Sequence, residues 1–455
     1  MNAKVIFITF VAALAGLLFG FDTAVISGTI PLVKEQYELT AALTGWFVSS
    51  ALVGSILGVS CSGYLGDKLG RKYLLMVAAG LFLVSAIGCA FSMSLFGLIL
   101  YRILGGIAIG LASMVAPLYI SEISPKAYRG RLVTIYQLAI TLGILGAYFS
   151  NNYIQVYAKE FALITGFFGD EIWRGMFAVE VIPAGLFLLG LIVVPKSPRW
   201  LALHGERLKA QQISKELAID FDDKEEDNKE VHLKTLFTGA LKKPMGISIF
   251  LMLFSQLCGI NAIIYYGPSI LAAAGFSMSE SLGGQVTIGI VNTLFTFLAI
   301  AYIDKWGRKP LLLLGASGVT IALLITGSLF ALNVVSGYWV VGGILLFISC
   351  YAFSLGPVQF VVASEVFPTN YRAKAMSIST LVLWAANAVV GQVFPMLLEG
   401  LGAAATFIIF GIICIPSIYF IKKYIPETKG KSLEEIEKLW SSASEKETTE
   451  ILEKA

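Results

Sequence analysis

Three ionisable side chains lie deep inside long apolar stretches of the sequence: Asp22, Arg102 and Glu180. A charge in such surroundings is costly, so it usually pairs with an opposite charge or has a function. A buried carboxyl can take up and release a proton, whereas an arginine stays charged. These residues are therefore candidates for a proton-coupled step, with Glu180 either on the proton route or packing between helices.

The depths of Asp22 and Arg102 in their apolar stretches predict an ion pair. Asp22 lies about 17 residues along its stretch, or ~25 Å of helix, and Arg102 about 7 residues from the start of its own. If the two helices run in opposite directions, both residues lie in the outer half of a core ~30 Å thick. Protonation of Asp22 would release Arg102; the alternative is a static structural pair.

Carboxamides form a second set of polar side chains in the apolar stretches: Gln137, Gln256, Asn261, Asn292 and Asn387. Amides donate and accept hydrogen bonds at once, which suits a small ligand with many hydroxyl groups. Gln256 and Asn261 flank Gly259, and this pattern predicts a helix that breaks within the membrane and presents polar groups to a cavity. The alternative is that the amides join neighbouring helices.

The elements that position these residues are apolar blocks. The chain of 455 residues is 57% hydrophobic and only 14% charged, and blocks such as Val5–Ile30 and Ala42–Leu65 have the length of a bilayer-spanning helix. Twelve such blocks predict an all-α membrane protein, and the first block is a retained helix with no cleavage pattern behind it. The five cysteines lie in apolar blocks without metal-ligand spacing, which indicates small core residues.

The positive charges predict the orientation. With a cytoplasmic N-terminus, the outer connections carry only Lys34 and Lys159, while Arg102 lies inside the fourth helix and Arg174 at the outer end of the sixth. The other 29 of the 33 Lys and Arg then lie on the cytoplasmic side, so both termini are expected in the cytoplasm. We expect a multi-pass protein of the inner or plasma membrane.

Two motifs occur twice in the same order. Gly66-Asp67-Lys68-Leu69-Gly70-Arg71-Lys72 returns as Ile303-Asp304-Lys305-Trp306-Gly307-Arg308-Lys309, 237 residues later. The second motif begins with Ser121-Glu122-Ile123-Ser124-Pro125 and continues to Arg131. It returns 243 residues later as Ser364-Glu365-Val366-Phe367-Pro368. The chain is therefore predicted to be two six-helix halves in parallel repeat.

The repeats and the one long polar stretch divide the chain. We predict an N-terminal half (1–194), a cytoplasmic linker with short helices (195–244), a C-terminal half (245–425) and a cytoplasmic tail (426–455). The linker holds a helix over Leu201–Leu217 and an acidic run, Asp220 to Glu230, interpreted as a solvated segment. The tail is expected to form an amphipathic helix over Ser432–Trp440.

Charged residues of the repeated motifs are candidates for a cytoplasmic gate: Asp67, Arg71, Glu122, Arg129, Asp304, Arg308, Glu365 and Arg372. Opposite charges at helix ends can pair when that side is closed and separate when it opens. Each partly solvated pair contributes about 1 kcal/mol or less, yet several together bias a two-state equilibrium. Topology alone would explain the basic residues but not the acids that accompany them in both halves.

Several motifs resemble the sugar porter family of the major facilitator superfamily over the whole chain. They are Pro195-Lys196-Ser197-Pro198-Arg199-Trp200-Leu201, Pro426-Glu427-Thr428-Lys429-Gly430, Gln256-Leu257-Cys258-Gly259-Ile260-Asn261 and Tyr101-Arg102-Ile103-Leu104-Gly105-Gly106. The resemblance implies a major facilitator fold and sugar transport. Phe19-Gly20-Phe21-Asp22 is similar to the proton-coupled members, whereas uncoupled facilitators tend to carry Asn at position 22.

The resemblance also implies a sugar site. Residues at positions that hydrogen-bond the sugar are Gln137, Gln256, Asn261 and Asn292, and aromatic Phe19 and Trp384 line the same cavity; Phe360 and Asn387 complete the candidate set. Three positions depart from the pattern: Ser255 replaces a Gln, Phe360 a Trp, and Leu383 an Asn or Gln. Gln359, next to Phe360, either compensates or faces another helix. A hexose, pentose or related polyol is therefore expected, but no particular sugar.

The expected function is proton-coupled symport of a monosaccharide by alternating access. The alternatives are an uncoupled facilitator and a sugar sensor that keeps the fold, while the two proline-rich motifs argue against a drug antiporter. The sequence has no phosphate-binding loop, metal cluster or nucleophile–base arrangement, so we expect neither an enzyme nor a cofactor or metal. The expected partners are the sugar, the proton and the lipid bilayer, with no nucleic acid, and the chain is expected to act as a monomer.

Overall fold

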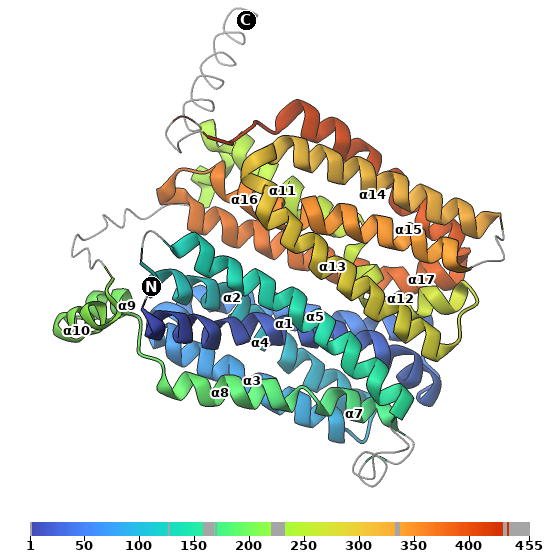
Figure 1. Cartoon of the computed structure of the whole chain (residues 1–455), viewed down its shortest axis with the longest axis horizontal. Coiled ribbons are helices and arrows are strands. Elements are labelled where there is room, and N and C mark those ends of the chain that lie inside the picture. The colour runs from blue at the N-terminus through green and yellow to red at the C-terminus, as the bar shows by residue number, and fades with distance from the viewer. Residues whose placement is uncertain are drawn as a thin grey trace, which may run out of the picture. The chain divides into compact units, whose positions relative to one another are not determined.

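A computed structural model of the chain describes residues 2–125, 128–157, 168, 171–219, 233–332, 337–430 and 435. Within these ranges the regular elements are helices, and no strand occurs (Figure 1). The acidic run 220–230, Lys159 and, apart from Glu435, the predicted tail helix 432–440 lie outside the described residues.

The helices of the first half are α1 (Ala3–Gln36), α2 (Ala41–Leu69), α3 (Arg71–Phe91), α4 (Leu95–Glu122), α5 (Arg129–Tyr157), α7 (Ile172–Ala178) and α8 (Val181–Val193). The linker holds α9 (Pro198–Leu203), α10 (Arg207–Leu217) and the short 3₁₀ helices η2 (Leu233–Phe237) and η3 (Gly239–Leu241). The second half holds α11 (Lys242–Leu257), α12 (Ile260–Ala273), α13 (Met278–Trp306), α14 (Arg308–Ala331), α15 (Gly337–Cys350), the π-helical turn η4 (Tyr351–Leu355), α16 (Gly356–Glu365) and α17 (Thr369–Tyr424).

The number of spans agrees with the prediction. Eleven segments of the described chain are long and apolar enough to cross a membrane, and one of them, Lys374–Tyr424, has 51 residues. That is about 77 Å of helix, far more than a hydrocarbon core of about 30 Å requires. At Gly402 the backbone turns away from helical geometry (φ 78°, ψ 167°), so α17 is two helices that meet there. Counting both gives the twelve predicted spans.

The outward faces of these helices are apolar. On α8, for example, Ile182, Leu186, Leu189 and Val193 are each more than half exposed. So much exposed aliphatic surface on consecutive turns is unfavourable in water, but it matches lipid chains. The protein is therefore a multi-pass membrane protein.

The chain forms two compact units. Unit 1 comprises residues 1–224, 262–293 and 391–399, and unit 2 comprises 225–261, 294–390 and 400–455. Unit 1 thus contains the first half together with parts of α12, α13 and α17. The division of the sequence into repeats at residues 194 and 245 concerns a different property, the duplication, and it stays a prediction.

Small residues allow the helices of unit 1 to approach closely. α1 and α5 run side by side (Figure 1), and a Cβ atom on Gly20 would lie only 2.0 Å from the carbonyl oxygen of Ile140. A Cβ atom on Gly143 would lie equally close, 2.0 Å, to the carbonyl oxygen of Leu17. Glycine at such crossings lets two backbones touch, which is how helices gain packing energy in a membrane.

Hydrogen bonds join the parts of unit 1 that are distant in sequence, at the end where α1 leads into α2. The Ser49 hydroxyl donates to Gln392 Oε1 (2.9 Å), and the Tyr266 hydroxyl donates to the carbonyl oxygen of Gly391 (2.6 Å). The Tyr148 hydroxyl donates to the carbonyl oxygen of Ile264 (3.1 Å). These bonds explain why residues 262–293 and 391–399 belong to unit 1.

The linker helix differs from the prediction. The helix expected over Leu201–Leu217 is two helices, α9 and α10, because Gly205 adopts a left-handed conformation (φ 82°) between them. The Trp200 and Leu201 side chains of α9 pack on Ala210 of α10. The break therefore produces a helical hairpin, which places Trp200 against the repeated motif of the first half.

Candidate functional site

The two charges predicted to pair are in contact. In unit 1, Nη1 of Arg102 on α4 donates to Oδ1 of Asp22 on α1 at 2.6 Å. Both residues are almost completely buried, with exposed fractions of 2% and 1%. Asp22 Oδ2 and Arg102 Nε have no hydrogen-bond partner, so each of these charged groups keeps an open position.

Glu180 completes this cluster because helix six is broken beside it. Pro183 has no backbone N–H to donate to the carbonyl of Val179, and the regular helix is interrupted between α7 and α8 at Val179 and Glu180, although both residues keep helical φ and ψ angles. Glu180 is 1% exposed and lies within electrostatic range of both Asp22 and Arg102. Its Oε1 has no hydrogen-bond partner. The structure therefore brings together the three ionisable side chains predicted from sequence.

The walls of the charged cluster hold the guanidinium in place. The centroid of the Phe177 ring lies 5.9 Å from the guanidinium carbon of Arg102, within the range of a cation–π contact. A Cβ atom on Gly105 would lie 2.5 Å from the Ser85 hydroxyl oxygen and 3.5 Å from Asp22 Oδ1. Glycine at position 105 thus leaves the space that the pair occupies. Such a cluster can bind one proton on a carboxylate while its net charge stays small.

The amides of helix seven form a cluster in unit 2. Gly259 has a positive φ (85°), which ends α11 and starts α12 as predicted, and a Cβ atom there would meet the Phe410 ring at 3.0 Å. Across the break, Asn261 Nδ2 donates to Gln256 Oε1 at 2.5 Å. Gln256 Nε2 in turn donates to the Ser255 hydroxyl oxygen at 3.2 Å. The break therefore presents two side-chain amides that orient each other.

The other predicted substrate residues lie in both units. In unit 1, Phe19 on α1 and Gln137 on α5 are half-buried and Asn292 on α13 is buried; the Gln137 amide has no hydrogen-bond partner in the described part of the chain. In unit 2, Trp384 and Asn387 on α17 are buried, and Phe360 on α16 is 37% exposed. Direct contact within the set is established for Gln256 and Asn261. The remaining members stay candidates.

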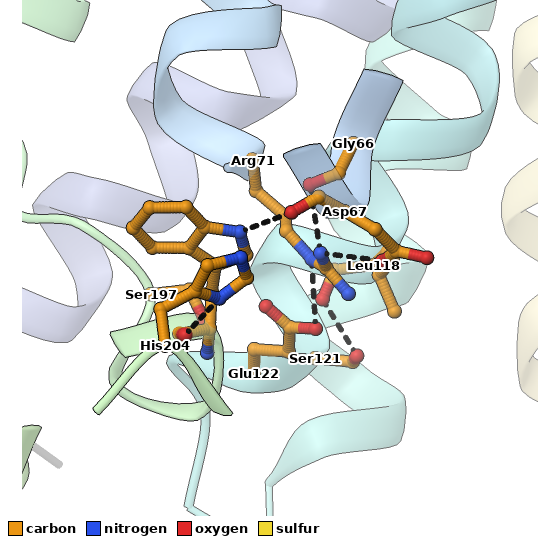
Figure 2. A network of polar contacts seen from close by, with 9 residues as sticks. Gly66, Asp67, Arg71, Leu118, Ser121, Glu122, Ser197 and His204 are labelled. Carbon is orange, nitrogen blue, oxygen red and sulfur yellow. Dashed lines mark hydrogen bonds and ion pairs between the residues drawn. The ribbon is translucent and has the colours of Figure 1, made fainter. Parts of the chain in front are cut away.

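The repeated motif of unit 1 is an ion network in which Arg71 and Glu122 are buried and Asp67 is exposed (Figure 2). Arg71 donates through Nε to Glu122 Oε1 (3.1 Å) and through Nη1 to Asp67 Oδ1 (3.0 Å) and to the carbonyl oxygen of Gly66 (2.8 Å). The Trp200 indole N–H donates to the carbonyl oxygen of Asp67 (2.7 Å). Gly70 (φ 88°) ends α2, and its Cβ position lies 3.1 Å from the Trp200 ring. We call the group of Asp67, Arg71, Glu122 and Trp200 the motif end of unit 1.

The motif end of unit 2 repeats the arginine–glutamate pair. Arg308 donates through Nη2 to Glu365 Oε1 (3.1 Å) and through Nε to Oε2 (3.3 Å). Glu427 accepts from the backbone N–H groups of Arg308 (2.9 Å) and Lys309 (3.0 Å), which begin α14. The Thr428 hydroxyl donates to Glu365 Oε2 (2.6 Å).

The backbone hydrogen bonds to Glu427 change the pKa of its carboxyl. Partial burial raises the pKa of its carboxyl, but the backbone N–H donors of Lys429, Arg308 and Lys309 favour the charged form. The net result is a pKa below the ordinary glutamate value. Glu427 is therefore an ionised helix cap at neutral pH.

Two of the predicted gate residues, Arg129 and Arg372, are not in ion pairs of this kind in the described part of the chain. Arg129 is exposed at the start of α5 and makes no ion pair in the described part of the chain. Arg372 donates to the carbonyl oxygen of Phe367 (3.3 Å), and its Nε has no partner. Asp304 lies in α13, and its side chain is outside the described residues.

Sequence analysis did not assign Trp200, Glu427 or Thr428 to the candidate gate. All three belong to the proline-rich motifs that follow helices six and twelve, and these motifs were noted only for their resemblance. Their recurrence after the last helix of each half was the available signal. The structure also offers no group of three His, Cys, Asp or Glu placed to hold a metal ion among the described residues.

Twelve spans, two repeated motif ends and polar clusters buried at mid-span define a polytopic membrane transporter built from two repeats. The chain belongs to the sugar (and other) transporter family, whose profile matches residues 8–440. This membership agrees with the predicted major facilitator fold and with a transporter rather than an enzyme.

Relatives match almost the whole chain. The arabinose-proton symporter of Bacillus subtilis is 40% identical over 446 residues, which are 96% of this chain and 95% of the relative. The galactose-proton symporter of Escherichia coli K12 is 37% identical over 454 residues, 96% of this chain and 94% of the relative. The xylose transporter of E. coli, solved in a partially occluded inward-open conformation, superimposes with a TM-score of 0.81 at 34% identity, covering 95% of this chain and 100% of that one.

Proposed function

We propose that this protein is a secondary active transporter that couples the movement of a monosaccharide (a hexose, pentose or related polyol) to that of a proton. The observation that carries the proposal is the buried cluster of Asp22, Arg102 and Glu180 in unit 1. The similarity to arabinose-proton and galactose-proton symporters supports it.

The cluster suggests how a proton acts on the protein. With Asp22 ionised, its Oδ1 holds Arg102 by a charge-assisted hydrogen bond. A proton taken up at Asp22 turns the ion pair into a neutral acid beside a guanidinium, and the attraction falls. Arg102 then has Glu180 as its remaining carboxylate. Release of the proton on the opposite side restores the first arrangement, so protonation biases the two access states.

For the substrate we propose a site lined by the candidate amides and aromatic rings. Gln256 and Asn261 supply oriented donors and acceptors in unit 2, and Gln137, whose amide has no partner in the described part of the chain, supplies them in unit 1. A sugar presents hydroxyl groups around its ring and an apolar face, which match amides and aromatic rings respectively. Phe19, Asn292, Phe360, Trp384 and Asn387 are the further candidates for this site.

For the motif ends we propose gating on the cytoplasmic side. The pairs Arg71–Glu122 and Arg308–Glu365 each hold helices of one half together, with side-chain exposures of 9% and 2% in unit 1 and 13% and 25% in unit 2. The excess of Lys and Arg at this side supports cytoplasmic termini in an inner or plasma membrane. Accessibility of a cysteine introduced after residue 440 to a membrane-impermeant thiol reagent tests the orientation.

The proposal is tested with purified protein in liposomes that contain a pH-sensitive dye. A panel of hexoses, pentoses and inositol is added outside while internal and external pH are followed. Symport predicts alkalinisation of the medium with a transported sugar and with no other. Sugar entry without proton movement would make the protein a facilitator, the closest rival, and would leave Asp22 as a structural charge.

A further inference from the structure

Helix ten contains a wide turn with a local cause. Pro357 has no N–H, so the carbonyl of Phe353 four residues earlier lacks its usual partner. The backbone responds with the π-helical turn η4 over Tyr351–Leu355. Such turns inside α-helices often occur at functional sites, because they move side chains away from the normal helical face.

The first residue of this turn, Tyr351, directs its phenol toward other polar groups of unit 2. Its ring is stacked on that of Phe347 (centroids 6.4 Å apart, interplanar angle 11°), and a Cβ atom at Gly356 would lie 3.4 Å from the ring. The phenol lies within electrostatic range of the Ser255 and Gln359 side chains. Tyr351 therefore stands between polar groups of α11 and α16, with its ring packed on Phe347.

Gln359 on α16 has an unmet hydrogen-bonding capacity. The residue is 2% exposed, and its Oε1 has no hydrogen-bond partner. The Tyr351 phenol lies within electrostatic range of this amide, whose acceptor oxygen is unpaired in the described part of the chain. A buried acceptor without a partner costs about 1–3 kcal/mol, and native structures contain few of them. A ligand that donates a hydrogen bond would remove this cost.

The polar contacts form one continuous chain within unit 2, and it ends at candidate substrate residues. Asn261 donates to Gln256, and Gln256 donates to Ser255; Tyr351 lies within electrostatic range of both Ser255 and Gln359.

We propose that Gln359 determines substrate specificity: its Oε1 accepts a hydrogen bond from one hydroxyl group of the transported monosaccharide, and Tyr351 positions the amide. This inference rests on the proposed sugar transport and adds to it. A site built to bond a hydroxyl group discriminates strongly against an analogue without it, because its polar group is then left unpaired. The substrate class is therefore a monosaccharide with a free hydroxyl at the position that Gln359 reaches.

The test compares the transported sugar with its single-deoxy analogues in counterflow exchange by the full-length protein in liposomes. The sugar is first chosen as the one of L-arabinose, D-xylose, D-galactose and D-glucose that wild type exchanges. Wild type should then bind one particular deoxy analogue about tenfold more weakly than the parent sugar. In Gln359→Leu, the parent should bind about tenfold more weakly, while that one analogue is no longer distinguished from it.

Two further variants separate a binding role from a structural one. Tyr351→Phe should reduce the same discrimination severalfold, because the amide loses its positioning partner. Gln359→Leu should keep or raise the thermal unfolding temperature, since it removes an unpaired buried acceptor. Gln285→Leu is the control: its amide is also buried with a free Oε1, but its nitrogen donates to the carbonyl of Ile264 (3.1 Å) in unit 1, so it should not change the discrimination.

The inference is overturned if Gln359→Leu and Tyr351→Phe weaken binding of the parent and all analogues equally, or if Gln285→Leu alters the same analogue. It is also overturned if Gln359→Leu unfolds at a clearly lower temperature and Tyr351→Phe keeps the wild-type pattern. If wild type exchanges none of the sugars, the proposed function itself fails. That outcome is distinct, because it appears before any variant is made.

Discussion

The two halves place different chemistry at corresponding positions of the repeat. Asn261 follows Asp22 by 239 residues, within the 237 to 243 that separate the repeated motifs. Tyr101-Arg102 with Gly105-Gly106 likewise returns as Tyr338-Trp339 with Gly342-Gly343. The tyrosine and the glycine pair are retained, whereas the charged residues become an amide and an indole. Duplication has kept the scaffold, and ionisable groups at this depth remain in unit 1.

The motif ends show the same divergence in a milder form. Pro195-Lys196-Ser197 corresponds to Pro426-Glu427-Thr428, and both hydroxyl residues contact the glutamate of their own arginine pair. Glu427, however, caps α14, whereas α3 has no side-chain cap at its start and Lys196 lies over the rings of Tyr73 (5.2 Å) and Trp200 (5.3 Å). The two motif ends thus share the arginine–glutamate pair but stabilise the start of the following helix by different means.

Asp22→Asn has the largest expected effect on transport, because it gives unit 1 the neutral amide chemistry of unit 2. Uphill accumulation of sugar should disappear, because no carboxylate remains to exchange a proton with Arg102. Exchange of sugar down its gradient should persist. Both are measured in liposomes with an imposed proton gradient. Glu35→Gln, at an exposed acid on the same helix, is the control and should accumulate sugar normally; unchanged accumulation by Asp22→Asn would refute coupling at this site.

Arg102→Ala should damage transport as severely as Asp22→Asn and should also lower stability. The change leaves Asp22 and Glu180 buried without a cation, and removal of one partner from a buried pair typically costs about 3–5 kcal/mol. Asp22→Asn combined with Arg102→Ala should recover part of that loss, since the unpaired charge is gone. Thermal unfolding of the purified variants measures both effects, and a mild effect of Arg102→Ala would count against the pair.

Alanine at Gln256 or Asn261 tests the other side of the comparison. Each change removes one side-chain amide that orients the other across the break at Gly259. Loss of a hydrogen bond of about 1 kcal/mol should weaken sugar binding about fivefold to tenfold, with folded protein retained. Asn151→Ala is the matched control, because that buried amide bonds the Val25 carbonyl (3.0 Å) and should affect stability without affecting affinity. Normal affinity in both test variants would move the site elsewhere.

The sequence was sufficient for features that depend on one dimension only. Hydrophobic runs predicted the twelve spans, counting along two helices predicted the contact of Asp22 with Arg102, and Gly259 predicted the break in helix seven. Each of these follows from the rise of a helix or from the φ angle of a single residue.

Features that depend on packing between distant segments were not predictable. Trp200 bonds the carbonyl of Asp67 only because Gly205 turns α10 back on α9, and nothing in the periodicity of 201–217 indicated that turn. Arg129 was expected in the gate by its position in a motif, yet it lies exposed. The role of Glu427 requires its carboxylate to reach the start of α14, more than a hundred residues earlier in the chain.

Glu427→Ala should destabilise unit 2 through loss of its helix cap. Removal of a capping side chain costs about 1 kcal/mol. Because the pKa of Glu427 lies below its unfolded value, this contribution is complete above the ordinary glutamate pKa and disappears as the pH falls through the lowered one. Thermal unfolding of wild type and variant should therefore differ at pH 7 and converge in acid. Glu399→Ala, at an exposed acid paired with Lys34, is the control, and it should have little effect on the unfolding temperature. A difference between wild type and Glu427→Ala that does not depend on pH would contradict ionic capping.

Lys196→Glu has the smallest expected effect. It tests the difference between the two motif ends directly, because it gives unit 1 the acid that unit 2 already has. A carboxylate at position 196 can accept from the free N–H groups at the start of α3, as Glu427 does at α14, and it removes the repulsion between Lys196 and Lys72. A gain of about 1 kcal/mol should raise the unfolding temperature by on the order of 1–2 °C. Lys196→Gln removes the repulsion without supplying an anionic cap, so it should give only part of the gain. If the two variants are equally stable, relief of the repulsion with Lys72 accounts for the whole gain in stability. If Lys196→Glu is less stable than wild type, the contacts of Lys196 with Tyr73 and Trp200 stabilise the motif end of unit 1. The two halves are then stabilised there by different means.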